Sequence, residues 1–319
     1  MKHNINVTTY LIILFYLSQL IGLFVVNQSI QDVIKVDGIT QVQYEEVAVE
    51  RPETEGAESF NFMLGSIFVG TMLVLVLIKF RLHKVWKIWF LLAVGSTLAI
   101  SLSIFLDNRI AYIIGFIFAY FKIFRPNVYV HNFTEVFMYS GIAVLLVPIF
   151  DVFWMLMLLL AISVYDAFAV WKSKHMIKMA KFQSETKLFA GLNIPYEIKG
   201  HKKGKVVSLN SPPLPDHMKK VNIKSKMNAH VKQEGSVRSA ILGGGDIAFP
   251  LLFAGSVMID LIKSDIPRNL AFLKTLPVPL FAGFALIYLF WRSEKGKFYP
   301  AMPFITVGCL LGYGIVLLI

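Results

Sequence analysis

Long apolar stretches separated by short polar breaks run through most of this chain. Nine of them approach or reach the roughly 20 residues that an α-helix needs to cross a hydrocarbon core. Lipid offers the backbone no hydrogen-bond partner, and the stretches are far longer than the strands of a membrane barrel, so each is predicted to be a helix. The predicted spans are residues 8–27, 60–79, 85–106, 110–124, 133–150, 151–171, 239–262, 272–291 and 300–319.

The fourth and first spans carry features that qualify this pattern. The fourth is short, contains Lys122 and stops at Arg125-Pro126. The first follows Lys2, as the apolar part of a signal peptide would, but no convincing small-residue cleavage site follows Val26. We therefore expect the first span to be retained.

A hydrophilic stretch divides the spans into two groups. Residues 1–171 are predicted to form a six-helix membrane bundle, and residues 239–319 a three-helix membrane bundle. Between them, residues 172–238 form a basic loop with little apolar surface to bury, including the proline-rich run from Ser211 to Pro215. This composition favours a largely flexible cytosolic loop, disordered or with a short extended element, lying against anionic lipid headgroups.

Composition and charge support the membrane class and exclude a nucleic-acid one. Of the 319 residues, 56% are hydrophobic and only 16% are charged, with a mean hydropathy of +0.64, which is too apolar for one soluble core. The net charge of +11 has a single source, because residues 172–238 hold fourteen Lys and one Arg against four acids. A basic loop beside a membrane explains this charge, and no nucleic-acid partner is expected.

The distribution of basic residues predicts the orientation. Lys and Arg are retained on the cytosolic side of a membrane. A cytosolic N-terminus places 25 of the 31 basic residues inside, and 10 against 6 when the long loop is left out. We therefore expect a multi-pass protein of the cell membrane with a cytosolic N-terminus, a cytosolic 172–238 loop and an outside C-terminus.

Two aspartates, Asp166 and Asp246, lie inside apolar stretches. A charged side chain at the centre of a membrane helix costs at least about 2.5 to 3.5 kcal/mol, so such residues mark functional sites by default. The sixth and seventh spans are consecutive, antiparallel and joined by the cytosolic loop. At about 1.5 Å per residue, both carboxyls lie about 8 to 11 Å below the cytosolic interface. We expect them to meet at one level.

Two carboxyls within hydrogen-bond reach share one proton and titrate as a unit. The ionised member can take a proton from an attacking water, while the protonated member polarises a peptide carbonyl and later helps the amine leave. This is peptidase chemistry and needs no cofactor or metal. The single cysteine, Cys309, excludes a disulfide within the chain and a cysteine metal site, and the loop histidines match no zinc spacing: His201, His217 and His230.

Two backbone features accompany the aspartates. Gly243, Gly244 and Gly245 are costly in a helix and allow a helix or an extended substrate to approach Asp246, although three glycines alone would indicate a helix-packing patch. Pro300-Ala301-Met302-Pro303 prevents a regular helix and leaves backbone groups for an extended peptide, although alone it would indicate an ordinary proline-marked helix start.

These residues carry a family resemblance that covers most of the chain. Tyr165-Asp166, the G-x-G-D of Gly243 to Asp246 and the Pro-Ala-Met-Pro run resemble, in order and placement, the Y-D, G-x-G-D and P-A-L motifs of the presenilin and signal peptide peptidase family of intramembrane aspartyl proteases. The resemblance implies a nine-helix presenilin-like bundle, catalytic roles for Asp166 and Asp246, and a substrate-positioning role for Pro300, Ala301 and Met302.

The chain departs from the family pattern at one position, where methionine replaces the leucine of P-A-L with an apolar side chain of similar volume, so little loss is expected. The motif match also favours a hydrogen bond from Tyr165 to the dyad, or contact with substrate, over simple helix packing. The cytosolic basic loop makes the orientation presenilin-like, and the compact length is similar to that of an archaeal presenilin homologue.

Two other functions stay open at this point. Buried carboxylates also serve as relays in proton-coupled transporters and ion channels, although we find no inverted repeat in this chain. A prepilin-type peptidase also uses G-x-G-D but gives no reason for the Pro-Ala-Met-Pro run. The expected partners of a protease are transmembrane-helix substrates and lipid, and self-association stays open.

The remaining polar and breaking residues receive structural interpretations. Gly308 and Gly312 fit close helix packing, and Pro277 and Pro279 are expected to kink the eighth span. Four acids fall at span edges, where headgroups and water are expected to solvate them: Glu135, Asp151, Asp260 and Asp265.

Overall fold

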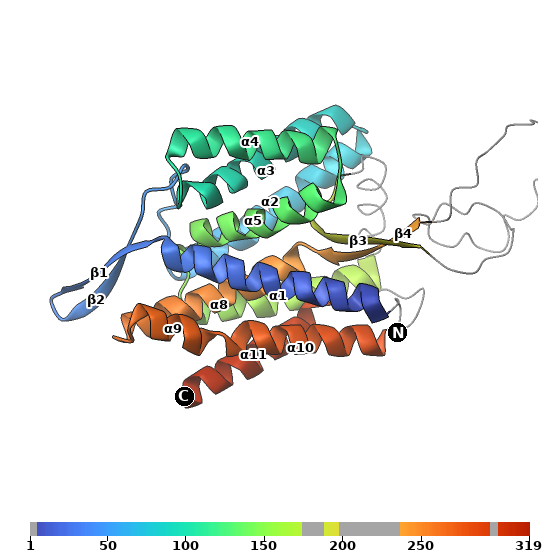
Figure 1. Cartoon of the computed structure of the whole chain (residues 1–319). Helices are drawn as coiled ribbons and strands as arrows, with labels where there is room; N and C mark the ends of the chain where they lie inside the picture. The colour runs from blue at the N-terminus through green and yellow to red at the C-terminus, as the bar shows by residue number, and fades with distance from the viewer. Residues whose placement is uncertain (1–4, 174–187, 198–236, 294–298) are drawn as a thin grey trace, which may run out of the picture.

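A bundle of roughly aligned helices forms the body of the protein (Figure 1). The computed structural model describes residues 5–173, 188–197, 237–293 and 299–319. The N-terminal end of α1 and the strands β3 and β4 lie at one end of the bundle, and the C-terminus lies toward the other. Most of the predicted flexible loop falls outside the described residues.

Each of the nine predicted spans contains a helix, which confirms the all-α membrane class. Seven stretches within the described residues are long and apolar enough to cross a membrane; α11, with 17 residues, is a shorter apolar helix. The helices are α1 (Ile5–Gln28), α2 (Ala57–Lys79), α3 (His83–Ser103), α4 (Asn108–Phe124), α5 (Val128–Leu146), α6 (Val152–Phe168), α8 (Gly245–Lys263), α9 (Arg268–Thr275), α10 (Pro277–Arg292) and α11 (Met302–Leu318).

Polar side chains fix where three of these helices begin. Asp107, Asn127 and Asp151 accept hydrogen bonds from the first free amides of α4, α5 and α6, at 2.8 to 2.9 Å. Such caps satisfy N–H groups that have no partner inside the helix. Asp151, predicted to lie solvated at a span edge, is an exposed helix cap.

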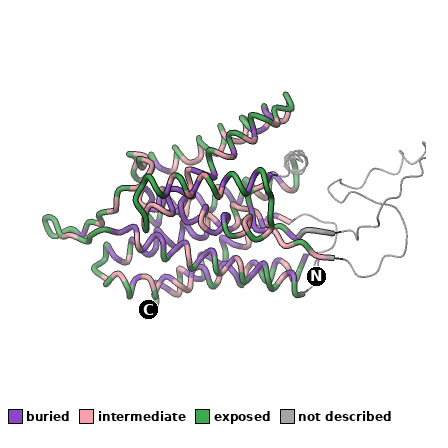
Figure 2. The backbone as a smooth tube through the Cα atoms, turned by 45° about the horizontal axis from the view of Figure 1, so that its top comes forward, coloured by how far each residue is buried: buried purple, intermediate pink, exposed green. Residues whose placement is uncertain are grey.

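The centre of the bundle is built around α8, whose residues are buried along most of its length. Buried backbone gathers in the middle of the bundle (Figure 2). Helix α8 contacts α1, α5, α6 and α11. The helices approach closely where glycines remove side chains. A Cβ on Gly308 would lie 2.5 Å from the Phe281 carbonyl oxygen of α10, and one on Gly312 would lie 2.6 Å from that of Pro277. The predicted packing role of these two glycines is confirmed.

A β-hairpin that the sequence analysis missed follows α1. Its strands are β1 (Ile30–Val36) and β2 (Ile39–Tyr44), joined by Asp37 and Gly38 with φ of 52° and 81°. Two positive φ angles define the hairpin turn for which Asp-Gly is the characteristic sequence. That dipeptide was the overlooked signal.

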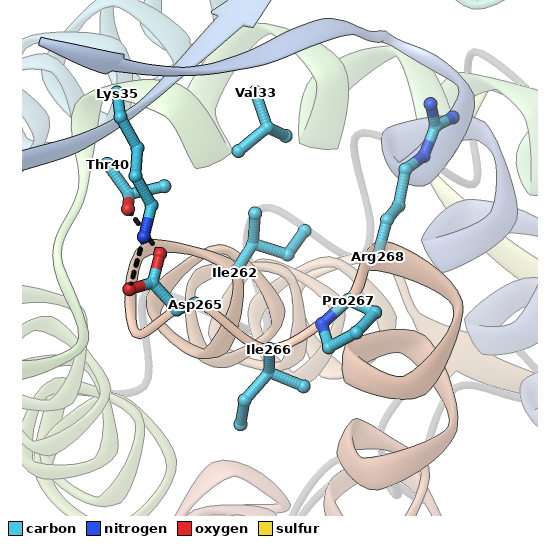
Figure 3. A pocket seen from close by; sticks show the side chains of 8 residues that line it. All are labelled: Val33, Lys35, Thr40, Ile262, Asp265, Ile266, Pro267 and Arg268. Atoms are coloured by element: carbon cyan, nitrogen blue, oxygen red, sulfur yellow. Dashed lines mark hydrogen bonds and ion pairs between the residues drawn. The ribbon is translucent and has the colours of Figure 1, made fainter.

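The hairpin is fastened to the turn between α8 and α9. Asp265 accepts hydrogen bonds from Lys35 at 2.8 Å and from Thr40 at 2.6 Å, and these bonds, that from Lys35 foremost, lower the pKa of its carboxyl. Beside them lies a pocket of about 300 Å³ (Figure 3). It is lined by Val33, Lys35, Thr40, Ile262, Asp265, Ile266, Pro267 and Arg268.

The predicted seventh span, residues 239–262, is wrong at its start. Residues Val237–Gly243 form strand β4, which pairs antiparallel with β3 (Gly191–Glu197), and α8 begins only at Gly245. The three glycines favour this break, because glycine is a poor helix former. Asp246 therefore lies in the first turn of its helix, not seven residues along it. The eighth predicted span is similarly divided, with Leu276 between α9 and α10 and Pro277 beginning α10.

Replacing Gly141 of α5 tests the close packing of the bundle. A Cβ there would overlap the Thr97 carbonyl oxygen of α3, whereas a Cβ on Gly70 of α2 meets nothing within 4 Å. We expect Gly141→Ala to lower the free energy of unfolding by about 1 to 3 kcal/mol, since backbone has to move. The matched control Gly70→Ala should change it by less than about 1 kcal/mol. Thermal unfolding in detergent compares the two, and equal midpoints would contradict the packing.

Candidate active site

Asp166 lies near the end of α6, at the N-terminus of α11. Its Oδ2 accepts a hydrogen bond from the Met302 amide at 3.1 Å, and the Ala301 amide also bonds to this carboxyl. The first amides of a helix have no partner within the helix and favour an anionic acceptor. The start of α11 thus supplies the contacts that hold Asp166.

A second contact, one turn before Asp166 on α6 and one turn after Met302 on α11, fixes these two helices against each other. Ser163 Oγ and Thr306 Oγ1 form a buried hydrogen bond of 2.7 Å. Ser163 precedes Asp166 by three residues and Thr306 follows Met302 by four, so both contacts lie along one helix-helix seam. Together they determine the height and rotation of Asp166 relative to α11.

The Pro-Ala-Met-Pro run forms the proline-marked helix start weighed from the sequence, and its binding of an extended peptide stays a prediction. It begins an ordinary helix, since Pro303 is the second residue of α11, where a missing N–H costs nothing. It also leaves the Met302 amide free of the helix, and that amide donates to Asp166. Met302 and Pro300 are buried, while Ala301 and Pro303 are partly exposed.

Asp246 lies in the first turn of α8, directly after the three glycines. A Cβ on Gly243 would lie 3.1 Å from Asp246 Oδ2, and the Gly243 backbone bonds to this carboxyl. The absence of a side chain at Gly243 thus gives the carboxylate its room. Asp166 is close enough to act electrostatically on Asp246. The helices that carry the two aspartates, α6 and α8, pack against each other, and hydrogen-bond contact between the two carboxyls stays a prediction.

The strands and α1 hold the glycine turn. The Gly244 amide donates to the Ala190 carbonyl at 3.2 Å, which continues the pairing of β3 with β4. The Gly244 carbonyl accepts the first intrahelical bonds of α8, from Ile247 at 3.2 Å and Ala248 at 2.9 Å. From α1, Gln19 Nε2 donates to the Ile247 carbonyl at 2.8 Å. The position of Gly244 thus sets that of the helical turn that carries Asp246.

Glu135 corrects the prediction of a solvated acid at a span edge. It is fully buried, forms an ion pair with Lys122 of α4 and accepts a hydrogen bond from Tyr139. Its partners come from α4 and α5, which bury the Glu135 side chain. Its position near the start of a predicted span had wrongly indicated solvation. Asp260 and Asp265, assigned the same interpretation, are exposed.

The other predicted site residues have less defined surroundings. Tyr165 is 41% exposed beside Asp166, and its role stays a prediction. Cys309 is buried in α11. Within the part of the chain that the structure describes, no three His, Cys, Asp or Glu side chains group as a metal site would require. The three loop histidines lie outside that part.

Comparison with known proteins identifies relatives along almost the whole chain. The family model described as signal-peptide peptidase, presenilin aspartyl protease matches residues 21–319. A solved presenilin family intramembrane aspartate protease in space group C222 is 13% identical, with a TM-score of 0.55 over 95% of this chain and 94% of the other. A presenilin family intramembrane aspartate protease structure in space group P2 is 17% identical, with a TM-score of 0.53 over 97% and 96%. No curated protein matches in a sequence comparison.

The hydrogen bond between Ser163 and Thr306 can be tested by a double-mutant cycle. Thr306→Val leaves a buried hydroxyl on Ser163 without this partner and should lower the free energy of unfolding by about 1 to 3 kcal/mol. Ser163→Ala should act similarly. Because replacing both partners by apolar groups restores a satisfied interface, the double variant should be more stable than the sum of the two losses predicts. Strictly additive losses in thermal unfolding would contradict this contact.

Proposed function

This chain belongs to the signal-peptide peptidase and presenilin aspartyl protease family, and we propose that it hydrolyses peptide bonds within the transmembrane helices of its substrates. Family membership makes it an intramembrane aspartyl protease and removes the transporter, channel and prepilin-peptidase alternatives. The catalytic residues proposed here are Asp166 and Asp246, acting as a general acid and base on one bound water.

One observation carries the assignment of these two residues. Asp166 on α6 and Asp246 on α8 come from packed helices and lie within electrostatic range of each other. Both residues are partly exposed, and the proposed reaction requires water at their carboxyls. Two carboxyls brought together in an apolar bundle are costly unless they share a proton, and shared-proton carboxyls are suited to peptide hydrolysis.

The mechanism follows from the two protonation states of the pair. The ionised carboxyl takes a proton from water as the water oxygen bonds to the peptide carbon, while the protonated carboxyl hydrogen-bonds to and then protonates the carbonyl oxygen. The resulting diol collapses as the C–N bond breaks: one carboxyl gives its proton to the nitrogen, while the other carboxylate takes a proton from a diol hydroxyl. An acid and an amine leave, and the pair again holds one proton.

The backbone around the aspartates is suited to holding an extended substrate. Gly243, Gly244 and Gly245 present little side-chain bulk beside Asp246, and β4 has a second edge that does not face β3. A peptide added to a strand edge binds through its main chain. We assign the same positioning role to the segment that leads into the first turn of α11 and to the aromatic neighbour of Asp166: Pro300, Ala301, Met302, Pro303 and Tyr165.

The orientation stays part of this proposal. The N-terminal end of α1 and the strands β3 and β4 lie at one end of the bundle (Figure 1). The positive-inside rule assigns the basic 172–238 stretch, which contains β3 and ends in β4, to the cytosol. The aspartates lie toward the same end, because Asp166 is near the end of α6 and Asp246 near the start of α8. Substrates are therefore cut toward the cytosolic side.

Replacing either aspartate tests the dyad. Asp166→Asn and Asp246→Asn should each lower cleavage of a transmembrane substrate by at least about 10² to 10⁴-fold, since each removes one half of the acid-base pair. Asp260→Asn is the matched control and should retain activity, because Asp260 is an exposed carboxyl at the far end of α8. Cleavage is measured with purified protein in liposomes. Wild-type rates in either single dyad variant would refute the assignment.

Substrate helix stability provides a second test. A helix hides its amides in hydrogen bonds, so cleavage requires local unwinding near the cut bond. Substrates with glycine near that bond should be cut faster than matched substrates with alanine, by up to about fivefold, the equivalent of about 1 kcal/mol of helix propensity. Rates are compared by single-turnover assays. Equal rates across such a series would remove the unwinding step from the mechanism.

A further inference from the structure

A fully buried ion pair lies next to the glycine turn and takes no part in the chemistry described above. Lys122 of α4 is 3% exposed and Glu135 of α5 is 0% exposed. Replacing a buried ion pair by apolar side chains is often neutral or stabilising, because desolvation of both charges offsets their attraction. Stability alone therefore does not account for these two residues, and the contacts of Glu135 suggest another role.

The second carboxylate oxygen of Glu135 faces the beginning of β3. While Oε1 pairs with Lys122, Oε2 accepts hydrogen bonds from the Tyr139 hydroxyl and, at 2.8 Å, from the Gly191 amide. One turn earlier on α5, His131 Nε2 donates to the Gly191 carbonyl at 2.8 Å. Both backbone groups of Gly191 are thus held by side chains of one helix.

Asn132 repeats this arrangement two residues farther along the strand. Its Nδ2 donates to the Asn193 carbonyl, and its Oδ1 accepts from the Asn193 amide, at 2.8 and 2.9 Å. Residues two apart in a strand direct their backbone groups to the same edge. His131, Asn132 and Glu135, here called the α5 clamp, therefore take the place of a neighbouring strand along the edge of β3 that does not face β4.

The sequence of β3 agrees with this division of its edges. Gly191, Asn193 and Pro195 are alternate residues of β3. Pro195 therefore directs its backbone groups to the same edge, away from β4. A proline has no N–H to donate and is tolerated only where the ladder does not need one. Gly191 has φ of +147°, and a Cβ there would overlap the Leu242 carbonyl oxygen, so only glycine fits at the clamped position.

Two routes of contacts connect the clamp to the turn that carries Asp246. Glu135 holds Gly191, whose neighbour Ala190 accepts the Gly244 amide. The Tyr139 hydroxyl, bonded to Glu135, lies 2.8 Å from the position of a Cβ on Gly244. Gly244 caps the first turn of α8. A shift of Glu135 would therefore move the turn that carries Asp246 from two directions.

We propose that Glu135, together with Lys122, Tyr139 and the rest of the α5 clamp, is a positioning centre that holds β3 and the glycine turn in place before substrate binds, and so sets the geometry of Asp246. The inference rests on the proposed function. These residues do not touch the reacting atoms. They act through β3 and Gly244, and Lys122 holds the Glu135 carboxylate in place through their ion pair.

The principal test replaces the ion pair without leaving a buried charge unpaired. The double variant Lys122→Met, Glu135→Leu should fold, with a thermal midpoint close to that of wild type, because apolar side chains replace both charges. Its kcat should fall by about 10 to 100-fold, the loss expected when a catalytic group is misplaced by about 1 Å, while KM stays within about threefold. Ser140→Ala is the matched control, because Ser140 is equally buried on α5 and, among the described residues, its hydroxyl bonds to Val136 of its own helix.

Amide hydrogen exchange supplies a readout that is independent of cleavage. In the Asp246→Asn background, the amides of Gly191 and Asn193 should be protected, and the double charge replacement should make that of Gly191 exchange at least about tenfold faster. Because this background is inactive, protection of the two strand amides tests the clamp whether or not the protein is a protease. Lack of cleavage by wild type would overturn the function alone.

A second variant decides the matter if the double replacement does not fold. Asn132→Ala removes one part of the clamp at a partly exposed position and leaves the ion pair intact. It should expose the Asn193 amide to exchange and lower kcat by about tenfold. The proposal would be overturned if a clamp variant folds and its strand amides exchange faster, but its kcat equals that of wild type.

Discussion

Two carboxyl groups held close together in an apolar helix bundle repel each other when both are ionised, and the surrounding contacts have to hold them there. The start of α11 holds Asp166 through its free amides. The glycine turn holds Asp246 by giving its carboxylate room beside Gly243. Helix packing alone would place the backbones, but these local contacts place the carboxyls.

The same requirement explains why irregular backbone is concentrated at this end of the bundle. Glycines and prolines weaken helices, and in lipid the freed amides and carbonyls need partners. Here the Met302 amide bonds to Asp166, the Gly244 amide to Ala190, and the Ile247 carbonyl to Gln19. These three backbone groups thus find partners within the protein, which allows irregular backbone beside a reactive site in a membrane-spanning fold.

The sequence was sufficient for the helices and the two aspartates, because apolar length and charge within an apolar run are both local signals. It failed at β4, since a short apolar strand continuous with a helix cannot be distinguished from that helix by hydropathy. Its partner β3 lies some forty residues earlier, beyond any local pattern. Glu135 was misjudged because its burial depends on Lys122, Tyr139 and Gly191, which only the folded chain brings together.

The most direct test of the central claim, that Asp166 and Asp246 form a single proton-sharing unit, is labelling by a hydroxyl-containing inhibitor that mimics the diol intermediate of aspartyl proteases. The structure predicts one label per chain, competed by a transmembrane substrate and lost on replacing either aspartate by asparagine. Undiminished labelling of either variant would show that the two carboxyls do not act together.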